Sequence, residues 1–133
     1  MDEHERLAQG MKVRRAVHGE DFVEKSIQGR TAFNGEFQDL LTRYAWGEIW
    51  NRPGLDRKTR SLLCLAMMVA LNRGDEFRLH VRSALNNGVT REQIKEVLLQ
   101  AAVYCGMPAA NSAFVVAAEI FAEIDEQPVS HGG

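Results

Sequence analysis

Residues 46–88 read WGEIWNRPGLDRKTRSLLCLAMMVALNRGDEFRLHVRSALNNG, and we expect the rest of the chain to be organised around them. Two apolar-patterned segments, 57–72 and 75–87, flank a turn-forming sequence that contains Gly74. Their apolar side chains recur at helical spacing and show none of the alternation expected of a strand. The stretch therefore predicts a helical hairpin at the centre of the fold.

The first segment of this hairpin is expected to be a central helix that is buried on nearly all sides. Asp56 is a good N-cap, and apolar residues occupy most of the helix circumference. Its first turn nevertheless carries Arg57, Lys58 and Arg60. Cations at a helix N-terminus oppose the helix macrodipole, at a cost of roughly a few tenths of a kcal/mol each. They indicate either a functional site or a surface where the cations pair with nearby acids.

The second segment carries the histidine that is the best candidate for proton chemistry. His80 falls on the edge of the apolar stripe of this helix, and Gly88 is a natural residue to end it. Glu76 lies one turn earlier on the same side, so the two side chains can meet. A carboxylate neighbour favours the protonated imidazole and holds the ring in one orientation. A half-buried histidine with a purely structural role is the alternative.

The flanking segments also have helical patterns, which predicts an all-α bundle of six or seven helices in a single domain, residues 1–126. The helices expected outside the hairpin cover residues 2–17, 20–29, 32–50, 90–105 and 108–125. Thr90 and Gln93 have the capping-box pattern. Arg14 and Arg15 are either solvated or in contact with an anion or a neighbouring subunit. Residues 127–133 are expected to form a disordered tail.

Composition narrows the class of protein and of partner. The chain of 133 residues is 45% hydrophobic and 26% charged, which is typical of a soluble globular domain. Its formal net charge of -2 argues against a nucleic-acid partner. No apolar run reaches the roughly 18 residues of a membrane span, and the acidic N-terminus is unlike a secretory signal. We therefore expect a cytoplasmic protein without a membrane partner, in which Cys64 and Cys105 are buried, reduced thiols.

Glu48 is a second candidate for proton transfer, because it stands between Trp46 and Trp50. A carboxylate that is desolvated by aromatic neighbours would hold its proton near neutral pH. An equally open alternative is a helix-end carboxylate paired with Arg52, four residues further on.

Resident metals and other cofactors have no motif in this chain. His80 and Glu76 supply only two ligands, and the other histidines, His4, His18 and His131, lie in terminal segments. There is no glycine-rich phosphate loop and no signature of a nucleophilic serine or cysteine. We expect no cofactor.

Three blocks of the chain resemble the carboxymuconolactone decarboxylase family. They are FQDLLTRYAWGEIWNRPGLDRKTRSL, the block that ends in HVRSALNNG at Gly88, and EVLLQAAVYCGMPAANSAF. The resemblance covers roughly residues 5–125, and its most specific pieces are WGEIW, GLDRKTRSL, His80 with Gly88 eight residues on, and AAVYCGMPAA. It implies the helical fold of the alkyl hydroperoxidase D-like superfamily.

One departure within that superfamily is informative about chemistry. Alkyl hydroperoxidase D-type proteins carry Cys-x-x-Cys-x-x-x-His on the corresponding helix. When His80 is aligned with that histidine, the two cysteine positions hold Arg73 and Glu76, and the upstream glutamate of the peroxidases falls near Ser61. The redox thiols are therefore missing, which argues against a peroxidase and agrees with the decarboxylase branch.

The resemblance implies a small anionic lactone as substrate, γ-carboxymuconolactone from protocatechuate breakdown in the β-ketoadipate pathway. The products would be β-ketoadipate enol-lactone and carbon dioxide. Loss of carbon dioxide leaves electrons that delocalise through a C=C bond into the lactone carbonyl, so the reaction needs no cofactor. The protein must hold a dianion, stabilise the developing oxyanion and deliver one proton.

The resemblance also suggests how the candidate residues share these tasks. His80 would donate the proton or bind the oxyanion, while Glu76 would orient it or Glu48 would act as the second proton-transfer group. Residues proposed to contact the substrate are Arg57, Arg60, Arg52, Trp46 and Trp50. The expected assembly is a homo-oligomer, with a hexamer favoured and a trimer possible.

Two other functions stay open at this point. One is that of a superfamily relative acting on a different small substrate, as a peroxidase or a lactone isomerase. The other is that of a non-catalytic helical oligomer that binds partners through its aromatic and alanine-rich faces.

Overall fold

The central hairpin is formed by α4 (Arg57–Ala70) and α5 (Gly74–Asn86), in a computed structural model that describes residues 1–127. The Asp56 carboxylate caps α4 by accepting a hydrogen bond from the backbone N–H of Thr59 at 2.7 Å. Where α5 ends, the Asn87 side-chain amide donates to Ser61 Oγ at 3.1 Å. This contact sets the antiparallel register of the hairpin.

The remaining helices precede and follow this hairpin. They are α1 (Glu3–His18), α2 (Glu20–Gln28), α3 (Gly35–Leu41), the π-helix η1 (Thr42–Ile49), α6 (Arg91–Cys105) and α7 (Met107–Glu126). The expected all-α class is confirmed, and residues 1–127 contain no strand. Thr90 and Gln93 form the predicted capping box. Gly19 and Gly106 have positive φ angles of 91° and 104°, which separate consecutive helices sharply.

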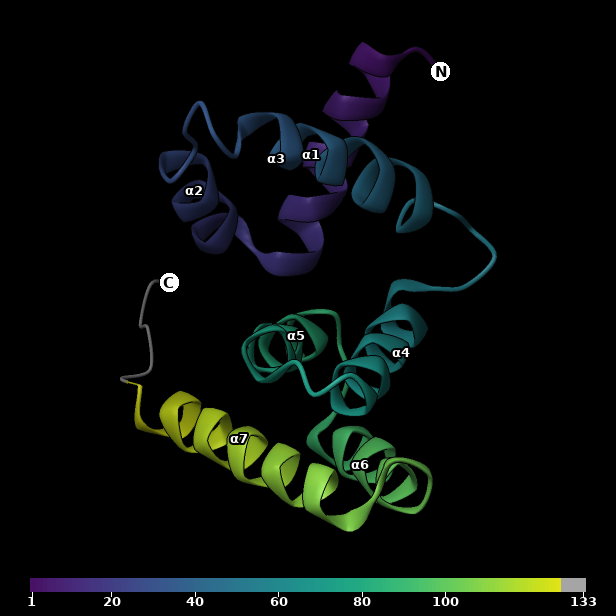
Figure 1. The fold of residues 1–133 in the computed structure, drawn as a ribbon, viewed down its shortest axis with the longest axis vertical. Coiled ribbons are helices and arrows are strands. Elements are labelled where there is room, and N and C mark those ends of the chain that lie inside the picture. Colours follow the sequence, from purple (N-terminus) through teal and green to yellow (C-terminus); the bar gives the residue numbers. More distant parts are fainter. Residues whose placement is uncertain (128–133) are drawn as a thin grey trace, which may run out of the picture.

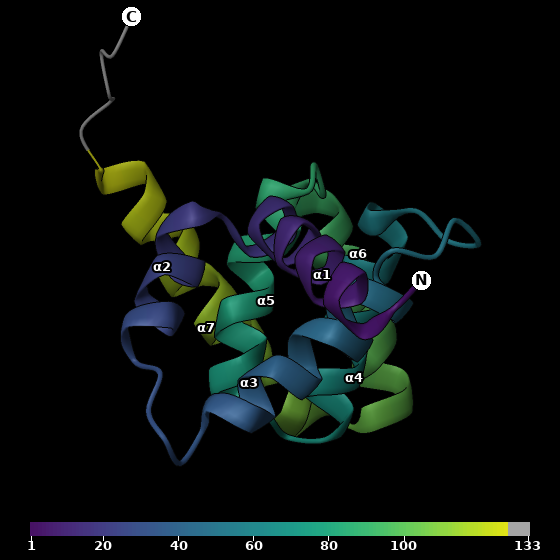
Figure 2. The ribbon, with the colours of Figure 1, turned by 90° about the horizontal axis from the view of Figure 1, so that it is seen from above.

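The helices lie in three levels (Figure 1). The N-terminal helices α1 to α3 form the upper level, α4 and α5 the middle, and α6 with the long α7 the lower. Seen from above, α1 lies over the middle level, and it contacts α5 (Figure 2). The boundary between the upper and middle levels is therefore formed by segments far apart in the sequence.

Two hydrophobic clusters follow this division into levels. The larger joins α4 to α7 and includes Leu65, Val81, Leu98 and Ile120, all almost completely buried. The smaller lies in the upper level; its members are Val13, Val17, Trp46 and Trp50, with Cys64 of α4 packed against it. Cys64 thus connects the tryptophan cluster to the central hairpin.

Helices α1 and η1 cross at two glycines. A Cβ atom on Gly10 would lie 2.0 Å from the carbonyl oxygen of Thr42, and one on Gly47 would lie 2.6 Å from that of Arg6. Neither distance is possible for a real side chain, so the two backbones touch directly. This close approach sets α1 firmly across η1 and determines what stands beside the tryptophans.

The structure corrects two predictions about individual helices. The segment 32–50 is not one α-helix: it begins at Gly35 and passes into the π-helix at Thr42. The central helix α4 is also not buried all round, because α5, α6 and α7 cover only part of it. Leu63 and Met67 of α4 are 42% and 52% exposed.

Helix α7 is long and apolar enough to cross a bilayer, judged by length and composition alone. Core helices can pass the same test. Its buried face, with Ala113, Ala117 and Ile120, packs in the larger cluster. Most of the expected disordered tail, 128–133, lies outside the described residues.

Candidate active site

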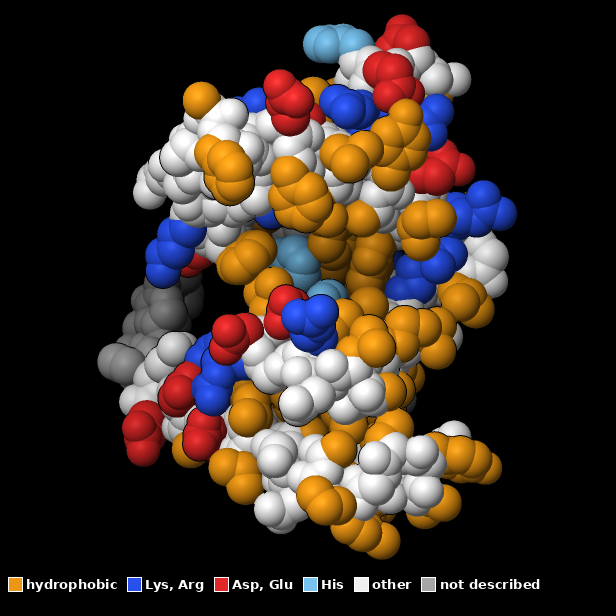
Figure 3. Space-filling view, in the orientation of Figure 1, with side chains coloured by type: hydrophobic (Ala, Val, Ile, Leu, Met, Phe, Trp, Pro, Cys, Tyr) orange, Lys and Arg blue, Asp and Glu red, His pale blue; other side chains and the backbone are white. Residues whose placement is uncertain are grey.

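Two histidines that are 62 residues apart in the sequence come together between the upper and middle levels. The ring centres of His18, at the end of α1, and His80, in α5, are 5.5 Å apart. Both side chains are mostly buried. In the space-filling view, histidine surface is visible inside a hollow between the two levels, with hydrophobic side chains around it (Figure 3).

Aromatic side chains enclose the histidine pair on the side of the upper level. The ring of His18 contacts Phe22 at 5.0 Å and meets the edge of Trp46 at 4.7 Å, measured between ring centres. Trp46 in turn stacks on Trp50 at 5.0 Å. The surroundings of the histidines are therefore largely apolar, which strengthens electrostatic effects on any ligand held there.

Hydrogen bonds between α1 and α5 hold the two histidines at this junction. The side-chain amide of Asn86 donates to the carbonyl oxygens of Ala16 and Val17, both at 3.0 Å. These are two of the carbonyl groups that the end of α1 leaves unpaired. Asn86 thereby anchors the last turn of α1, which carries His18, against the helix that carries His80.

Ser83 lies within hydrogen-bond distance of one ring nitrogen of His18. The Ser83 hydroxyl donates to the carbonyl oxygen of Leu79 at 3.1 Å, and its oxygen lies 2.5 Å from Nδ1 of His18. When the hydroxyl proton points to Leu79, the serine oxygen accepts a hydrogen bond from Nδ1–H. In that arrangement neutral His18 keeps an unprotonated Nε2 with a free lone pair.

Burial keeps both histidines neutral at physiological pH. It lowers the pKa of His18 to about 3, with smaller contributions from the charges of His80 and Arg14. Burial also lowers the pKa of His80, and the negative charge of Glu76 partly opposes that effect. The free site therefore presents two neutral imidazoles.

Neither Glu76 nor Glu48 is buried, and Glu48 forms the pair with Arg52 that was one of its two sequence interpretations. Glu76 is exposed, and within the described chain no hydrogen bond joins it to His80, although it acts through its charge. Glu48 is not desolvated between the tryptophans: its side chain is 45% exposed and pairs with Arg6 at 2.8 Å and with Arg52 at 3.8 Å. The reason is geometric, because residues two apart on a helix do not share a face.

The three arginines expected to hold the substrate do not meet the histidine pair in this chain. Arg57 and Arg52 are exposed, and Arg60 donates to the carbonyl oxygen of Arg52 at 3.3 Å. In the register set by Ser61 and Asn87, Arg57 and Arg60 lie beside the C-terminal end of α5. His80 is seven residues before Asn87, about 10 Å away along the helix axis.

Sequence reasoning missed two residues of this region, His18 and Arg14. His18 was set aside because it lies in a terminal segment, and Arg14 was left as either solvated or in contact with an anion. Arg14 is 5% exposed. A usable signal was the sequence of α1, where Arg14, Val17 and His18 lie on neighbouring positions of one face just before Gly19.

The arrangement is suited to moving a proton on a small organic anion. Two neutral imidazoles lie close together in apolar surroundings, and a dianion that entered would raise their pKa values. Cys64, beside the tryptophans, has a pKa raised by burial, so its thiol is held protonated. Residues 1–127 contain no group of three or more His, Cys, Asp or Glu side chains placed to hold a metal ion.

Comparison with known proteins agrees with the family resemblance of the sequence. The family model described as "Carboxymuconolactone decarboxylase family" matches residues 35–119, which is more than half of the chain. The matched region includes η1, the hairpin and His80, whereas α1 with Arg14 and His18 precedes it.

Individual relatives are similar over most of the chain. A 4-carboxymuconolactone decarboxylase of Acinetobacter baylyi is 44% identical over 96% of both chains. Nitrosuccinic acid decarboxylase npaB of Metarhizium robertsii is 47% identical over 85% of this chain and 80% of its own. A 48-residue sequence from Pseudomonas putida with the name 4-carboxymuconolactone decarboxylase is 48% identical and covers 36% of this chain.

Proposed function

This chain belongs to the carboxymuconolactone decarboxylase family, and from that premise we propose that it converts 4-carboxymuconolactone to β-ketoadipate enol-lactone and carbon dioxide. The observation that carries the proposal is the buried pair of neutral histidines inside an aromatic-lined hollow. Similarity to the Acinetobacter baylyi decarboxylase over 96% of both chains supports the choice of substrate. The reaction belongs to the breakdown of protocatechuate.

The chemistry requires the site to hold a dianion, to stabilise the developing oxyanion and to deliver one proton. The departing carboxylate sits on a carbon that is joined through a C=C bond to the lactone carbonyl. When the bond to carbon dioxide breaks, its electron pair delocalises into that carbonyl and forms a dienolate. The apolar walls around Trp46 favour movement of the charge away from the departing carboxylate, where it is concentrated, onto the delocalised dienolate. Protonation at the carbon next to the carbonyl then gives the enol-lactone.

We assign the proton transfer to His80. In the free protein its pKa is lowered by burial. The ring is therefore neutral and lacks the second, acidic proton of an imidazolium. Two negative charges of a bound substrate reverse this effect, because an anion within a few ångströms favours the imidazolium. Substrate binding therefore loads His80 with the proton that the dienolate later removes.

His18 acts as the neutral neighbour of His80. Its Nδ1–H is used by Ser83, so its free lone pair on Nε2 can accept a hydrogen bond from a protonated partner. A neutral acceptor at 5.5 Å between ring centres stabilises the imidazolium of His80 without adding a second positive charge. Ser83 has the role of a positioning residue in this scheme.

Nitrosuccinic acid is a second candidate substrate, because the Metarhizium robertsii relative named for it is 47% identical. The chemistry is parallel: a carboxylate leaves from the carbon that bears a nitro group, and the electrons move onto the nitro oxygens. The resulting nitronate is protonated on carbon. The same histidine pair would serve either reaction, so the contacts with the rest of the substrate decide between them.

The test is to incubate the purified protein with each compound and to follow carbon dioxide release together with loss of substrate absorbance. We expect turnover of the lactone to exceed that of nitrosuccinic acid in kcat/KM, to survive dialysis against a chelator, and to survive alkylation of Cys64 and Cys105. The matched control is His80→Gln at the same concentration. Preferred turnover of nitrosuccinic acid would reassign the substrate, and carbon dioxide release from neither compound would overturn the proposal.

A further inference from the structure

Among the residues that the structure describes, Arg14 is a buried cation without a counter-ion. Its side chain is 5% exposed. The guanidinium donates from Nη2 to Ser26 Oγ at 2.9 Å, and within the described residues its Nε–H has no acceptor. Within residues 1–127 no carboxylate lies within 4.0 Å of it, although other arginines in this chain form such pairs. A buried charge without a partner is costly, so such a group points to a ligand that completes it.

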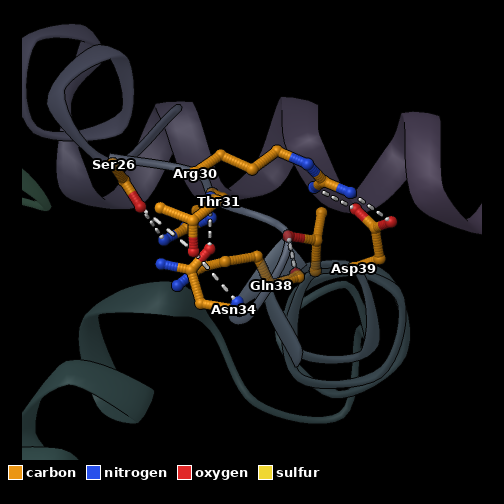
Figure 4. Close-up of polar contacts among 8 residues, drawn as sticks. Ser26, Arg30, Thr31, Asn34, Gln38 and Asp39 are labelled. Atoms are coloured by element: carbon orange, nitrogen blue, oxygen red, sulfur yellow. Dashed lines mark hydrogen bonds and ion pairs between the residues drawn. The ribbon is translucent and has the colours of Figure 1, made fainter. Parts of the chain in front are cut away.

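The carboxylate that lines the same pocket as Arg14 is already bound by another arginine. Asp39 lines the same small pocket as Arg14, but Arg30 binds both of its carboxylate oxygens, at 2.7 and 2.9 Å (Figure 4). Ser26, which accepts from Arg14, passes its own proton to Gln38 Oε1 at 3.4 Å. The residues around Arg14 therefore use each other as partners and leave its positive charge uncompensated.

The pocket beside Arg14 has the size of a functional group rather than of a whole substrate. Its volume is about 30 Å³, and its walls come from α1, α2, the loop residue Arg30, α3 and the first residue of η1. A space of this size is enough for a water molecule or the end of a carboxylate. It is too small for a lactone ring.

Arg14 lies one helical turn from the layer of side chains that contains His18, His80 and Trp46. It precedes His18 by four residues on α1, about 6 Å along the helix axis. On η1, Thr42 of the pocket precedes Trp46 of the aromatic layer by the same number of residues. The two layers are therefore stacked along the same pair of elements, and the charge of Arg14 is felt at His18.

We propose that Arg14 binds the carboxylate that the substrate keeps, while the carboxylate that leaves faces the histidine layer. This inference rests on the proposed function. Both candidate substrates carry two carboxylates and lose one of them, and the retained one is separated from the reacting carbon by a few bonds. A cation favours the retained group at every stage of the reaction, whereas at the departing group it would oppose the loss of charge that accompanies bond cleavage.

The two tryptophans of the chain provide a probe of binding that does not depend on catalysis. Trp46 and Trp50 stack on each other next to His18, so their fluorescence reports on ligands in the hollow. Succinate, a dicarboxylate that cannot undergo the reaction, is the titrant, and its dimethyl ester is the uncharged control. Saturable quenching or enhancement by succinate and none by the ester is expected for the natural protein.

Three variants separate binding by Arg14 from a structural role. Arg14→Met and Arg14→Gln should weaken succinate binding at least tenfold, and Arg14→Lys should recover part of the loss. Arg15→Gln is the matched control, because Arg15 is the next residue but pairs at the surface with Glu20 and Glu24. Since Arg14→Met removes an uncompensated buried charge, its melting temperature should equal or exceed that of the natural protein.

The outcomes divide clearly. Natural affinity for succinate in folded Arg14→Met or Arg14→Gln, or no saturable binding by the natural protein, would overturn the role of Arg14. If both variants fail to fold, Arg14→Lys is used instead, because it keeps the charge but loses the fork geometry. A weaker affinity of this variant for succinate supports the role of Arg14, and an unchanged affinity overturns it. If the protein decarboxylates neither compound yet binds succinate through Arg14, the proposed function fails and the anion site stands. If Arg14→Gln turns over the lactone with an unchanged KM, the anion site fails and the proposed function stands.

Discussion

His18 and His80 would both titrate close to neutral pH in water, and the fold removes that behaviour by burying them together. Desolvation is the main cost of charging either ring; neighbouring positive charge adds to that cost at His18, whereas the charge of Glu76 partly offsets it at His80. Arg14, one turn away, adds to the positive potential. At the scale of single residues, the site therefore has a deficit of negative charge that an organic dianion would satisfy.

The first prediction concerns His80. Replacement by Gln should lower kcat on the order of 10²- to 10⁴-fold, because the variant cannot deliver a proton to the dienolate. KM should change less than kcat, since the proton is delivered only after the bond to carbon dioxide has broken. Steady-state kinetics and a melting curve on the same preparation check this.

A purely structural His80 would give the opposite pattern. Its replacement would lower stability by about 1–3 kcal/mol and leave turnover close to normal. A stable His80→Gln variant with normal kcat would remove His80 from the mechanism and shift proton transfer to His18.

The second prediction concerns pH. The pKa of His18 is about 3 in the folded chain and close to 6.5 when unfolded, and that of His80 is lowered in the same direction. Below about pH 6.5 the unfolded chain therefore binds protons that the native chain does not, so the free energy of unfolding falls as pH falls. The slope approaches about 1.4 kcal/mol per pH unit for His18, and His80 adds to it in the same direction. Urea denaturation at pH 7, 6 and 5 measures it.

The control for the pH prediction is His18→Gln, in which one histidine no longer contributes. Its stability should depend less steeply on pH between 5 and 7 than that of the natural chain. Equal slopes for the two proteins would show that His18 is accessible and protonated in the folded state.

At the scale of elements, the site depends on how α1 is held. Gly10 and Gly47 let α1 and η1 touch, and Asn86 fastens the last turn of α1 to α5. The first contact brings His18 to Trp46, and the second brings it to His80 and Ser83. The π-helix contributes by placing Trp46 and Trp50 so that they stack.

The third prediction is that Gly10→Ala separates α1 from η1. The added methyl group would lie 2.0 Å from a backbone oxygen, which cannot move without distorting η1. We expect a loss of stability of about 1–3 kcal/mol, as for other cases of overpacking, and a loss of the His18–Trp46 contact. Chemical denaturation and the tryptophan emission spectrum check this. Gly54→Ala is the matched control, because nothing lies within 4 Å of a Cβ atom there.

At the scale of the whole molecule, a single chain leaves a large apolar surface uncovered. Exposed hydrophobic side chains on the middle and lower levels include Leu63, Met67, Leu71, Leu99, Val103, Tyr104, Met107 and Val115. A groove of about 300 Å³ opens between α4 and α6, lined by residues such as Leu63, Ala66 and Tyr104. Contiguous apolar surface of this kind marks interaction sites in folded proteins.

The fourth prediction is that copies of this chain cover that surface, as the family resemblance implies with a hexamer favoured. Light scattering should give a mass that is a multiple of 14.9 kDa at micromolar concentration. Tyr104→Glu should shift the mass towards that of one chain, because it places a charge in the apolar face. Lys25→Glu, an exposed change on α2, should have no effect. A natural chain that stays monomeric would contradict this prediction.

Most of the helices were readable from the sequence because their signals are local. The capping side chains of Asp56 and Thr90, the glycine at position 88 and the apolar spacing in the hairpin act within a few residues of the chain. The family resemblance likewise rests on contiguous blocks, and it supports the choice of His80. Such signals determine the all-α class and the order of the helices without reference to tertiary contacts.

Tertiary structure alone decided which groups surround each charged or titratable side chain. His18 is 62 residues from His80, and Arg14 is buried by α2 and α3, so no local pattern marks either one. The pairing of Glu48 with Arg6 and the open face of α4 follow from how the helices pack. Helix formation depends on neighbours in the chain, whereas desolvation and charge pairing depend on neighbours in space. For this reason the sequence by itself specified the helices and one histidine, and only the packing of α1 against η1 and α5 produced the site.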